Sequence, residues 1–287
     1  MSEVRMLGAG DEPALVNFLE ERIDTSLFLL SNAEAVGLED HGHPLEGTYA
    51  ATFDGDAMTA VAAHFWNGIL IVQGTDADVE RAARVAVARS GRALNGLIGP
   101  LTLVDAARRA LGAETRRERK AEPEILYGLD LEALRVPARL DARALVCRPP
   151  RADEVSGVLL DWRVEYAVEA LGAERTAGLR EVSRKELTER APAGWVLLDD
   201  ERPVSYSTFT ASTRGVVQVG GVYTPPELRG RGYGRAVVAG SLCVARERGS
   251  RRSVLFTPRT NIAAQRAYRA LGYEAVGDFA LVLFEGG

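Results

Sequence analysis

Gly221-Val-Tyr-Thr-Pro-Pro-Glu-Leu-Arg-Gly-Arg-Gly-Tyr-Gly-Arg-Ala236 follows an apolar run that begins at Val216, and it precedes a helix-forming stretch that extends to about Arg248. This order predicts a strand that ends at two prolines, a glycine-rich turn and the start of a helix. Such a turn directs backbone N–H groups and a helix dipole at one spot, which favours an anion such as a phosphate. Three glycines allow close approach of the backbone and three arginines add positive charge: Gly230, Gly232, Gly234, Arg229, Arg231 and Arg235.

The spacing of this turn differs from two common nucleotide-binding motifs. A dinucleotide fingerprint has G-x-G-x-x-G and an acidic residue about 20 positions later, whereas a P-loop has Gly-Lys-Ser/Thr. The pattern Arg-x-x-Gly-x-Gly after a strand and a proline-containing turn instead resembles the acyl-CoA pyrophosphate loop of the GNAT-type N-acetyltransferase superfamily. The motif alone leaves two alternatives open, an ordinary glycine turn before a helix and a nucleotide-binding protein of another kind.

The sequence after this loop strengthens the resemblance. Residues 253–257 read as a short buried strand, and residues 262–271 as a helix with Asn261 as its N-cap and Gly272 at its C-terminal end. In the family, an asparagine at this position contacts the pantetheine part of CoA, and a tyrosine seven residues later protonates the departing thiolate. The resemblance therefore implies that Asn261 binds the cofactor and that Tyr268 is catalytic. A phenol with a pKa near 10 suits that task, although a packed core aromatic is the alternative.

The resemblance also implies a full set of residues for the acyl donor. The strand end would present backbone groups to the pantetheine and the thioester carbonyl, and the glycine loop would hold the pyrophosphate. The expected cofactor-binding residues are Val222, Tyr223, Thr224, Arg229, Gly230, Arg231, Gly232, Tyr233, Gly234, Arg235 and Asn261. Charge agrees, because residues 227–269 hold ten arginines against two glutamates, a local charge of +8 in a chain of net charge −5. The acidic balance of the whole chain does not support nucleic-acid or membrane binding.

An internal repeat indicates two units. Residues 48–74 and 195–222 each read as two hairpins in series, and Ala107-Arg-Arg-Ala-Leu-Gly-Ala113 corresponds to Ala267-Tyr-Arg-Ala-Leu-Gly-Tyr273. The first half has acidic residues 74–80 in place of the glycine loop and Arg108 in place of the tyrosine, so it is not expected to bind CoA in this way.

The predicted fold is α/β, with two tandem GNAT-like units, each a mixed, mostly antiparallel sheet flanked by helices. Residues 1–135 are expected to form a diverged, non-catalytic domain, 136–150 a linker, and 151–287 the acetyl-CoA-binding catalytic domain. Two helices are expected within the latter, over 153–170 and 174–189, flanking a substrate groove.

A general base is not evident from the sequence. In relatives a glutamate often occupies one of two positions that are Gln218 and Phe256 here, and neither can accept a proton. Three carboxylates at helical spacing are candidates, although each can equally be a solvated surface group: Asp161, Glu165 and Glu169. A water relay or an already neutral amine is the alternative. His41 and His43 lie among acidic residues, but without a second ligand cluster we expect a polar loop and no metal site.

The expected activity is the transfer of an acetyl group from acetyl-CoA to an amine of a small molecule or peptide by direct attack. A non-catalytic module that binds acyl-CoA is the alternative, since the usual carboxylates are missing. No apolar run reaches 18 residues, and the N-terminus does not resemble a signal peptide. With only Cys147 and Cys243, a reducing cytoplasm is expected rather than a disulfide-stabilised, secreted protein. The sequence leaves the acceptor amine and the oligomeric state open.

Overall fold

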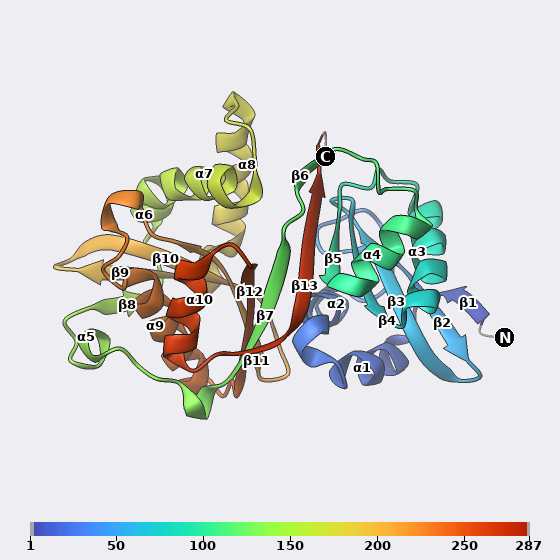
Figure 1. Cartoon of the computed structure of the whole chain (residues 1–287), viewed down its shortest axis with the longest axis horizontal. Coiled ribbons are helices and arrows are strands. Elements are labelled where there is room, and N and C mark those ends of the chain that lie inside the picture. Colours follow the sequence, from blue (N-terminus) through green and yellow to red (C-terminus); the bar gives the residue numbers. More distant parts are fainter. Residues whose placement is uncertain (1–2, 286–287) are drawn as a thin grey trace. The chain divides into compact units, whose positions relative to one another are not determined.

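A computed structural model describes residues 3–285 and divides into two compact units (Figure 1). The first unit contains the chain up to Ile125 together with the C-terminal stretch from Gly277. The second unit contains Leu126–Val276. Among the described residues, no helix is both long and apolar enough to cross a membrane.

The first unit is a sheet with helices on both faces. Its strand order is β1-β2-β3-β4-β5-β13, with β6 also paired to β13. Among these neighbours, β4 and β5 run parallel and the other pairs are antiparallel. Leu70 and Val72 pack with α3 and α4, whereas Ile71 packs with α1 and α2, as the alternation of side chains along a strand requires. The elements are β1 (Glu3–Met6), α1 (Glu12–Glu20), α2 (Ile23–Val36), β2 (Gly47–Asp54), β3 (Ala57–Phe65), β4 (Ile69–Gly74), α3 (Asp76–Ser90), β5 (Gly96–Pro100), α4 (Leu101–Ala110), β6 (Glu118–Lys120) and β13 (Glu274–Phe284).

The second unit repeats this plan with strand order β7-β12-β11-β10-β9-β8. Leu159 and Trp162 of α7 and Leu187 of α8 pack against Tyr206 and Tyr223 on one face of the sheet, while α9 contacts β8, β9, β10 and β11. The elements are β7 (Pro123–Asp130), η1 (Leu131–Ala133), α5 (Ala138–Asp141), β8 (Val146–Arg148), α6 (Ala152–Ser156), α7 (Val158–Leu171), α8 (Ala177–Arg190), η2 (Ala191–Ala193), β9 (Gly194–Asp199), β10 (Arg202–Thr213), β11 (Val216–Tyr223), η3 (Pro226–Leu228), α9 (Tyr233–Glu247), β12 (Arg252–Pro258) and α10 (Ile262–Leu271).

The internal repeat is also present in the hydrogen-bond register. In the first unit, the parallel pair joins Ile69–Ile71 to Gly96–Ile98. In the second, it joins Val216–Gln218 to Arg252–Val254. Each parallel pair is preceded by the two predicted hairpins in series, so the predicted repeat and the α/β class agree with the structure.

The units are bounded differently from the expected ranges 1–135, 136–150 and 151–287. Leu126–Asp130 of β7 belongs to the second unit, where β7 lies beside β12. Conversely, Phe279–Leu283 of β13, which the expected ranges place in the second domain, pairs with β5 of the first unit. The expected linker contains α5 and also β8, which pairs with β9. These differences arise because strands pair with partners that are distant in the sequence, which a division into consecutive ranges does not represent.

The expected helix over 153–170 is two helices, α6 and α7. The break is at Gly157, whose backbone (φ −107°, ψ −113°) is not helical. The helix expected over 174–189 is present as α8, with Thr176 as its N-cap.

Candidate active site

The parallel strands β11 and β12 separate over their C-terminal halves. Their paired residues end at Gln218 and Val254, although β11 continues to Tyr223 and β12 to Pro258. In the described part of these strands, the edge of Val219–Tyr223 that faces β12 therefore has no ladder partner. Backbone N–H and C=O groups along this edge are available to a ligand.

A bulge in β11 lies in the part of the strand that no longer pairs with β12. Thr208 pairs with Gly220 and Tyr206 with Tyr223, so β11 has one more residue than β10 between these pairs. Gly221 lies in this bulge with φ +57°, a conformation that favours glycine. The bulge changes the direction of the peptide groups that follow it, just before the predicted binding residues Val222, Tyr223 and Thr224.

The loop after β11 has the conformation that its glycines predict. The turn of η3 follows Pro225, and Gly230 and Gly232 then have φ values of +78° and +80°. Gly232 is the N-cap of α9, and the first bond of the helix joins the Ala236 N–H to the Gly232 carbonyl at 3.0 Å. The expected order of strand, glycine turn and helix start is therefore present over residues 216–236.

Six consecutive amide groups at this turn are unpaired. Within the part of the chain that the structure describes, no group accepts a hydrogen bond from the backbone N–H of residues 230–235. Three of these amides belong to the loop and three to the first turn of α9. Consecutive free amides at a helix N-terminus form an anion-binding concavity.

The three arginines of the loop differ in their contacts. The Arg229 guanidinium forms an ion pair with Glu169 of α7 at 2.5 Å, and its Nε donates to the Thr224 carbonyl at 2.9 Å. Arg231 is exposed and reaches the Glu227 carbonyl at 3.5 Å. The Nε of Arg235 is buried without a hydrogen-bond acceptor among the described residues. Arg231 and Arg235 thus keep most of their donors for a ligand, while Arg229 is already engaged.

Thr224 connects the end of β11 to the start of α9. Its hydroxyl is 2.9 Å from the hydroxyl of Ser205, a fully buried residue of β10 that also donates to the Tyr223 carbonyl at 2.9 Å. A Cβ at Gly234 would lie 3.4 Å from the Thr224 hydroxyl oxygen. The start of the helix therefore lies in van der Waals range of the strand end at this position. No local pattern in the sequence pointed to Ser205.

Asn261 and Tyr268 lie at the start and on the buried face of α10. The Asn261 side chain accepts from the Ala264 N–H at 3.1 Å, so its predicted role as N-cap is confirmed. Tyr268 is 8% exposed, and its ring centroid is 6.4 Å from that of Tyr127 and 6.0 Å from that of Tyr273. The structure thus places Tyr268 in an aromatic cluster, and its role in catalysis stays a prediction.

The three candidate bases are all held in ion pairs. Glu165 is bound by both terminal nitrogens of Arg175 at 2.7 Å, and Asp161 is bound by Arg180 at 2.6 Å. Glu169 is the partner of Arg229. The pKa of Glu165 is held below its usual value by the hydrogen bonds from Arg175. In this arrangement each of the three carboxylates has an arginine as its partner.

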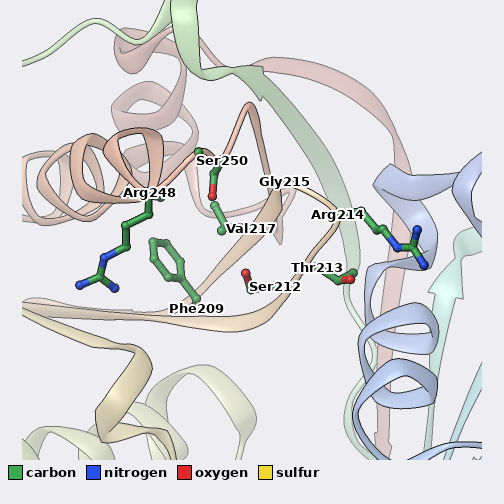
Figure 2. Close-up of a pocket in the computed structure, with 10 residues that line it drawn as sticks. Phe209, Ser212, Thr213, Arg214, Gly215, Val217, Arg248 and Ser250 are labelled. Carbon is green, nitrogen blue, oxygen red and sulfur yellow. The ribbon is translucent and has the colours of Figure 1, made fainter.

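A cavity of about 340 Å³ lies at the end of β11 and α9 that is opposite to the glycine loop, where β11 begins and α9 has ended (Figure 2). Phe209 and Val217 of the sheet line it together with Arg248 and Ser250. It contains none of the residues predicted to bind the acyl donor, so we do not assign the donor to it.

The corresponding segment of the first unit has no such loop. Only Thr75 separates β4 from α3. The Asp78 carboxylate accepts from the Thr75 hydroxyl at 3.1 Å and pairs with Arg81, so an acidic group occupies the start of the helix. Arg108, at the tyrosine position, forms an ion pair with Glu118.

The polar loop around His41 and His43 is organised by Glu46. This carboxylate accepts from the backbone N–H groups of His41 at 2.7 Å and His43 at 2.9 Å. Over the described range 3–285, no three His, Cys, Asp or Glu side chains are grouped to hold a metal ion.

Comparisons with known proteins bear on the family and the fold of the chain. Residues 159–273 match the family model of the acetyltransferase (GNAT) family. No match is found among curated proteins. Among solved structures, a Drosophila protein from a structural genomics programme has a TM-score of 0.68 at 12% identity, covering 98% of each chain.

Two further solved structures carry informative names. A GCN5-related N-acetyltransferase from Sphaerobacter thermophilus has a TM-score of 0.58 at 16% identity and covers 98% of this chain and 94% of that one. A tandem GNAT protein from the clavulanic acid biosynthesis pathway has a TM-score of 0.56 at 12% identity and covers 100% and 99%. At these identities the likeness shows the fold. The predicted fold of two tandem GNAT-like units is confirmed.

Proposed function

We propose that this chain, whose residues 159–273 form a domain of the acetyltransferase (GNAT) family, transfers an acetyl group from acetyl-CoA to an amine of a small molecule or peptide. Family membership supports acyl transfer in general. The choice of acetyl-CoA and of an amine acceptor is our inference from the site. One observation carries it: within the described residues 3–285, the six amides of residues 230–235 have no acceptor, and they follow, after a short turn, a strand whose edge facing β12 has no ladder partner.

These two features suit the two parts of an acyl-CoA. The amides of the loop and the side chains of Arg231 and Arg235 would hold the pyrophosphate, because charge-assisted bonds to phosphate are strong and directional. The free edge of β11 would pair with the pantetheine amides as an added strand does. Val222, Tyr223 and Thr224 would supply these backbone groups. Asn261 would contact the pantetheine from the start of α10.

In the reaction, the nitrogen of the acceptor forms a bond to the thioester carbon, the carbon–sulfur bond breaks, and the nitrogen loses a proton. Tyr268 would give its phenolic proton to the departing thiolate, since a phenol is protonated at neutral pH. With Asp161, Glu165 and Glu169 all paired to arginines, we assign the amine proton to solvent, or to an acceptor that arrives neutral.

We propose no acyl-donor site in the first unit, and infer that it has a structural role. The start of α3 carries Asp76 and Asp78 in its first turn, and these carboxylates would repel a pyrophosphate. The turn between β4 and α3 is also too short to form a cradle of amides.

Calorimetric titration with acetyl-CoA tests this function, with NAD and ATP as control ligands. We expect micromolar binding of acetyl-CoA alone, followed by thiol release in the presence of a suitable amine from a panel of small amines and peptides. Binding without turnover across the panel would favour the non-catalytic acyl-CoA-binding module. Absence of binding would contradict the assignment of the loop.

A further inference from the structure

The first residue of α9 is tied to the end of β9. The hydroxyl of Tyr233 donates to Oδ2 of Asp199 at 2.5 Å. Arg139 of α5 donates to both oxygens of the same carboxylate at 2.9 Å, and its guanidinium carbon lies 5.9 Å from the centroid of the Tyr233 ring. Three segments of the second unit therefore meet at one carboxylate next to the glycine loop.

Tyr233 is suited to hold the loop because its neighbours cannot. Gly230, Gly232 and Gly234 have no side chains, and Arg231 is exposed. Tyr233 is 6% exposed and is the buried side chain among residues 230–234. Glycines lose more conformational freedom on ordering than other residues, so a loop rich in glycine needs an anchor to keep its amides aligned.

The charge of Asp199 would disfavour an anion if it were uncompensated. The pKa of this carboxyl is held below its usual value by the hydrogen bond from Tyr233 and by the bonds from Arg139, so it is ionised at neutral pH. One terminal nitrogen of Arg139 donates to both oxygens of the carboxylate, and the positive charge of the guanidinium balances the charge of Asp199. Asp199 can therefore accept from Tyr233 without presenting a net negative charge to the loop.

We propose that Tyr233 and Asp199 are positioning residues for the phosphate of the acyl donor, and that Arg139 keeps the Asp199 carboxylate from repelling it. The proposal rests on the proposed function for the identity of the ligand. Tyr233 fixes the first turn of α9, and with it the direction of the free amides at residues 230–235. A loop that is already ordered before binding loses less conformational entropy when the ligand binds.

The test compares four variants by calorimetric titration with CoA at constant salt. Tyr233→Phe and Asp199→Ala both remove the anchor, and we expect each to weaken CoA binding by up to about 10- to 150-fold, the range of one hydrogen bond to a charged group. Asp199→Asn keeps an acceptor for the Tyr233 hydroxyl, so its affinity for CoA should remain within about 3-fold of that of the wild type. Arg139→Gln should weaken binding, and the loss should shrink as salt is raised, because it exposes a negative charge.

Tyr273→Phe is the matched control. The Tyr273 hydroxyl is 2.6 Å from that of Ser253, which pairs with Val217 at the opposite end of β11 from the loop. This variant also loses a buried hydrogen bond of a tyrosine hydroxyl, here to a neutral partner, so it should lower the melting temperature without changing the dissociation constant of CoA. Equal dissociation constants for Tyr233→Phe, Tyr273→Phe and the wild type would overturn the proposal.

A second readout needs no ligand. The ¹⁵N order parameters of residues 230–235 should fall in Tyr233→Phe relative to the wild type, and remain unchanged in Tyr273→Phe. If the wild type binds no CoA, the proposed function fails, while the order parameters still decide whether Tyr233 anchors the loop. Unchanged order parameters in Tyr233→Phe would refute the anchoring role.

Discussion

The guanidinium of Arg229 lies 2.5 Å from the carboxylate of Glu169, so the arginine that begins the glycine loop is bound to α7. Arg229 also donates to the Thr224 carbonyl at 2.9 Å, and its guanidinium carbon lies 5.7 Å from the centroid of the Tyr223 ring. A phosphate that used Arg229 would therefore have to compete with Glu169 for it.

This competition predicts that Glu169→Gln binds CoA more tightly than the wild type. Both side chains are close to half exposed, at 48% and 40%, and such pairs contribute about 0.2–1 kcal/mol. We expect a gain of about 2- to 5-fold in affinity, measured by calorimetry. Glu165→Gln is the control, because it removes the same charge from the same helix but releases Arg175. An equal gain in both variants would indicate a general charge effect, and weaker binding in Glu169→Gln would contradict the competition.

Tyr268→Phe should lower turnover while leaving the affinity for CoA nearly unchanged. Loss of one general acid reduces the rate about 10²- to 10⁴-fold, and less where water can replace it. Steady-state kinetics with an accepted amine would measure the loss. Tyr127→Phe is the control, since its ring centroid is 6.4 Å from that of Tyr268 and its hydroxyl has no partner among the described residues. Unchanged turnover in Tyr268→Phe would remove this residue from the mechanism.

Gly232→Asp should abolish the binding of CoA by placing a negative charge, in a strained left-handed conformation (φ +80°), beside the free amides. The matched variant is Gly249→Asp, at the other end of α9. Gly249 has φ +93°, and no atom lies within 4 Å of a Cβ placed there, so the two substitutions carry a similar backbone cost. Titration of both variants with CoA distinguishes the loss of the phosphate site from the effect of backbone strain. Retained affinity in Gly232→Asp would mean that the loop does not bind the phosphate.

Glu154 should stabilise the second unit in a pH-dependent way. Its carboxylate accepts from Arg148 at 2.6 and 2.8 Å and from the Arg151 N–H at 2.7 Å. The hydrogen bonds from Arg148 lower its pKa in the folded state. The contribution of Glu154 to the free energy of unfolding is therefore complete above the pKa of about 4.3 that it has in the unfolded chain. This contribution is lost as the pH falls through the lower pKa of the folded state.

Urea unfolding of the wild type and Glu154→Gln measures this contribution. At pH 7 we expect the variant to be less stable by about 1–3 kcal/mol, and the difference should shrink below pH of about 4.3. Glu181→Gln, which breaks an exposed pair with Arg184, should change the free energy of unfolding by less than about 0.5 kcal/mol at either pH. A difference between wild type and Glu154→Gln that does not depend on pH would contradict the assigned ionic role.

Local features of the site were predictable because neighbouring residues determine them. The glycines at 230 and 232 adopt the left-handed conformation, Asn261 caps α10, and the paired hairpins repeat in both units. Each of these depends on the backbone preferences of a few consecutive residues, or on a side-chain period that one strand or helix shows by itself. The family resemblance rested on these same local signals.

Contacts between distant segments were decided by the tertiary structure alone. β13 pairs with β5, and β7 lies beside β12, so the units do not follow the expected boundaries. Asp199, Ser205 and Arg139 reach the loop from other strands and helices, and Glu169 already holds Arg229. A strand edge or a carboxylate can accept many partners of suitable chemistry. Which partner it meets depends on how the whole chain closes, and no local pattern in the sequence carries that information.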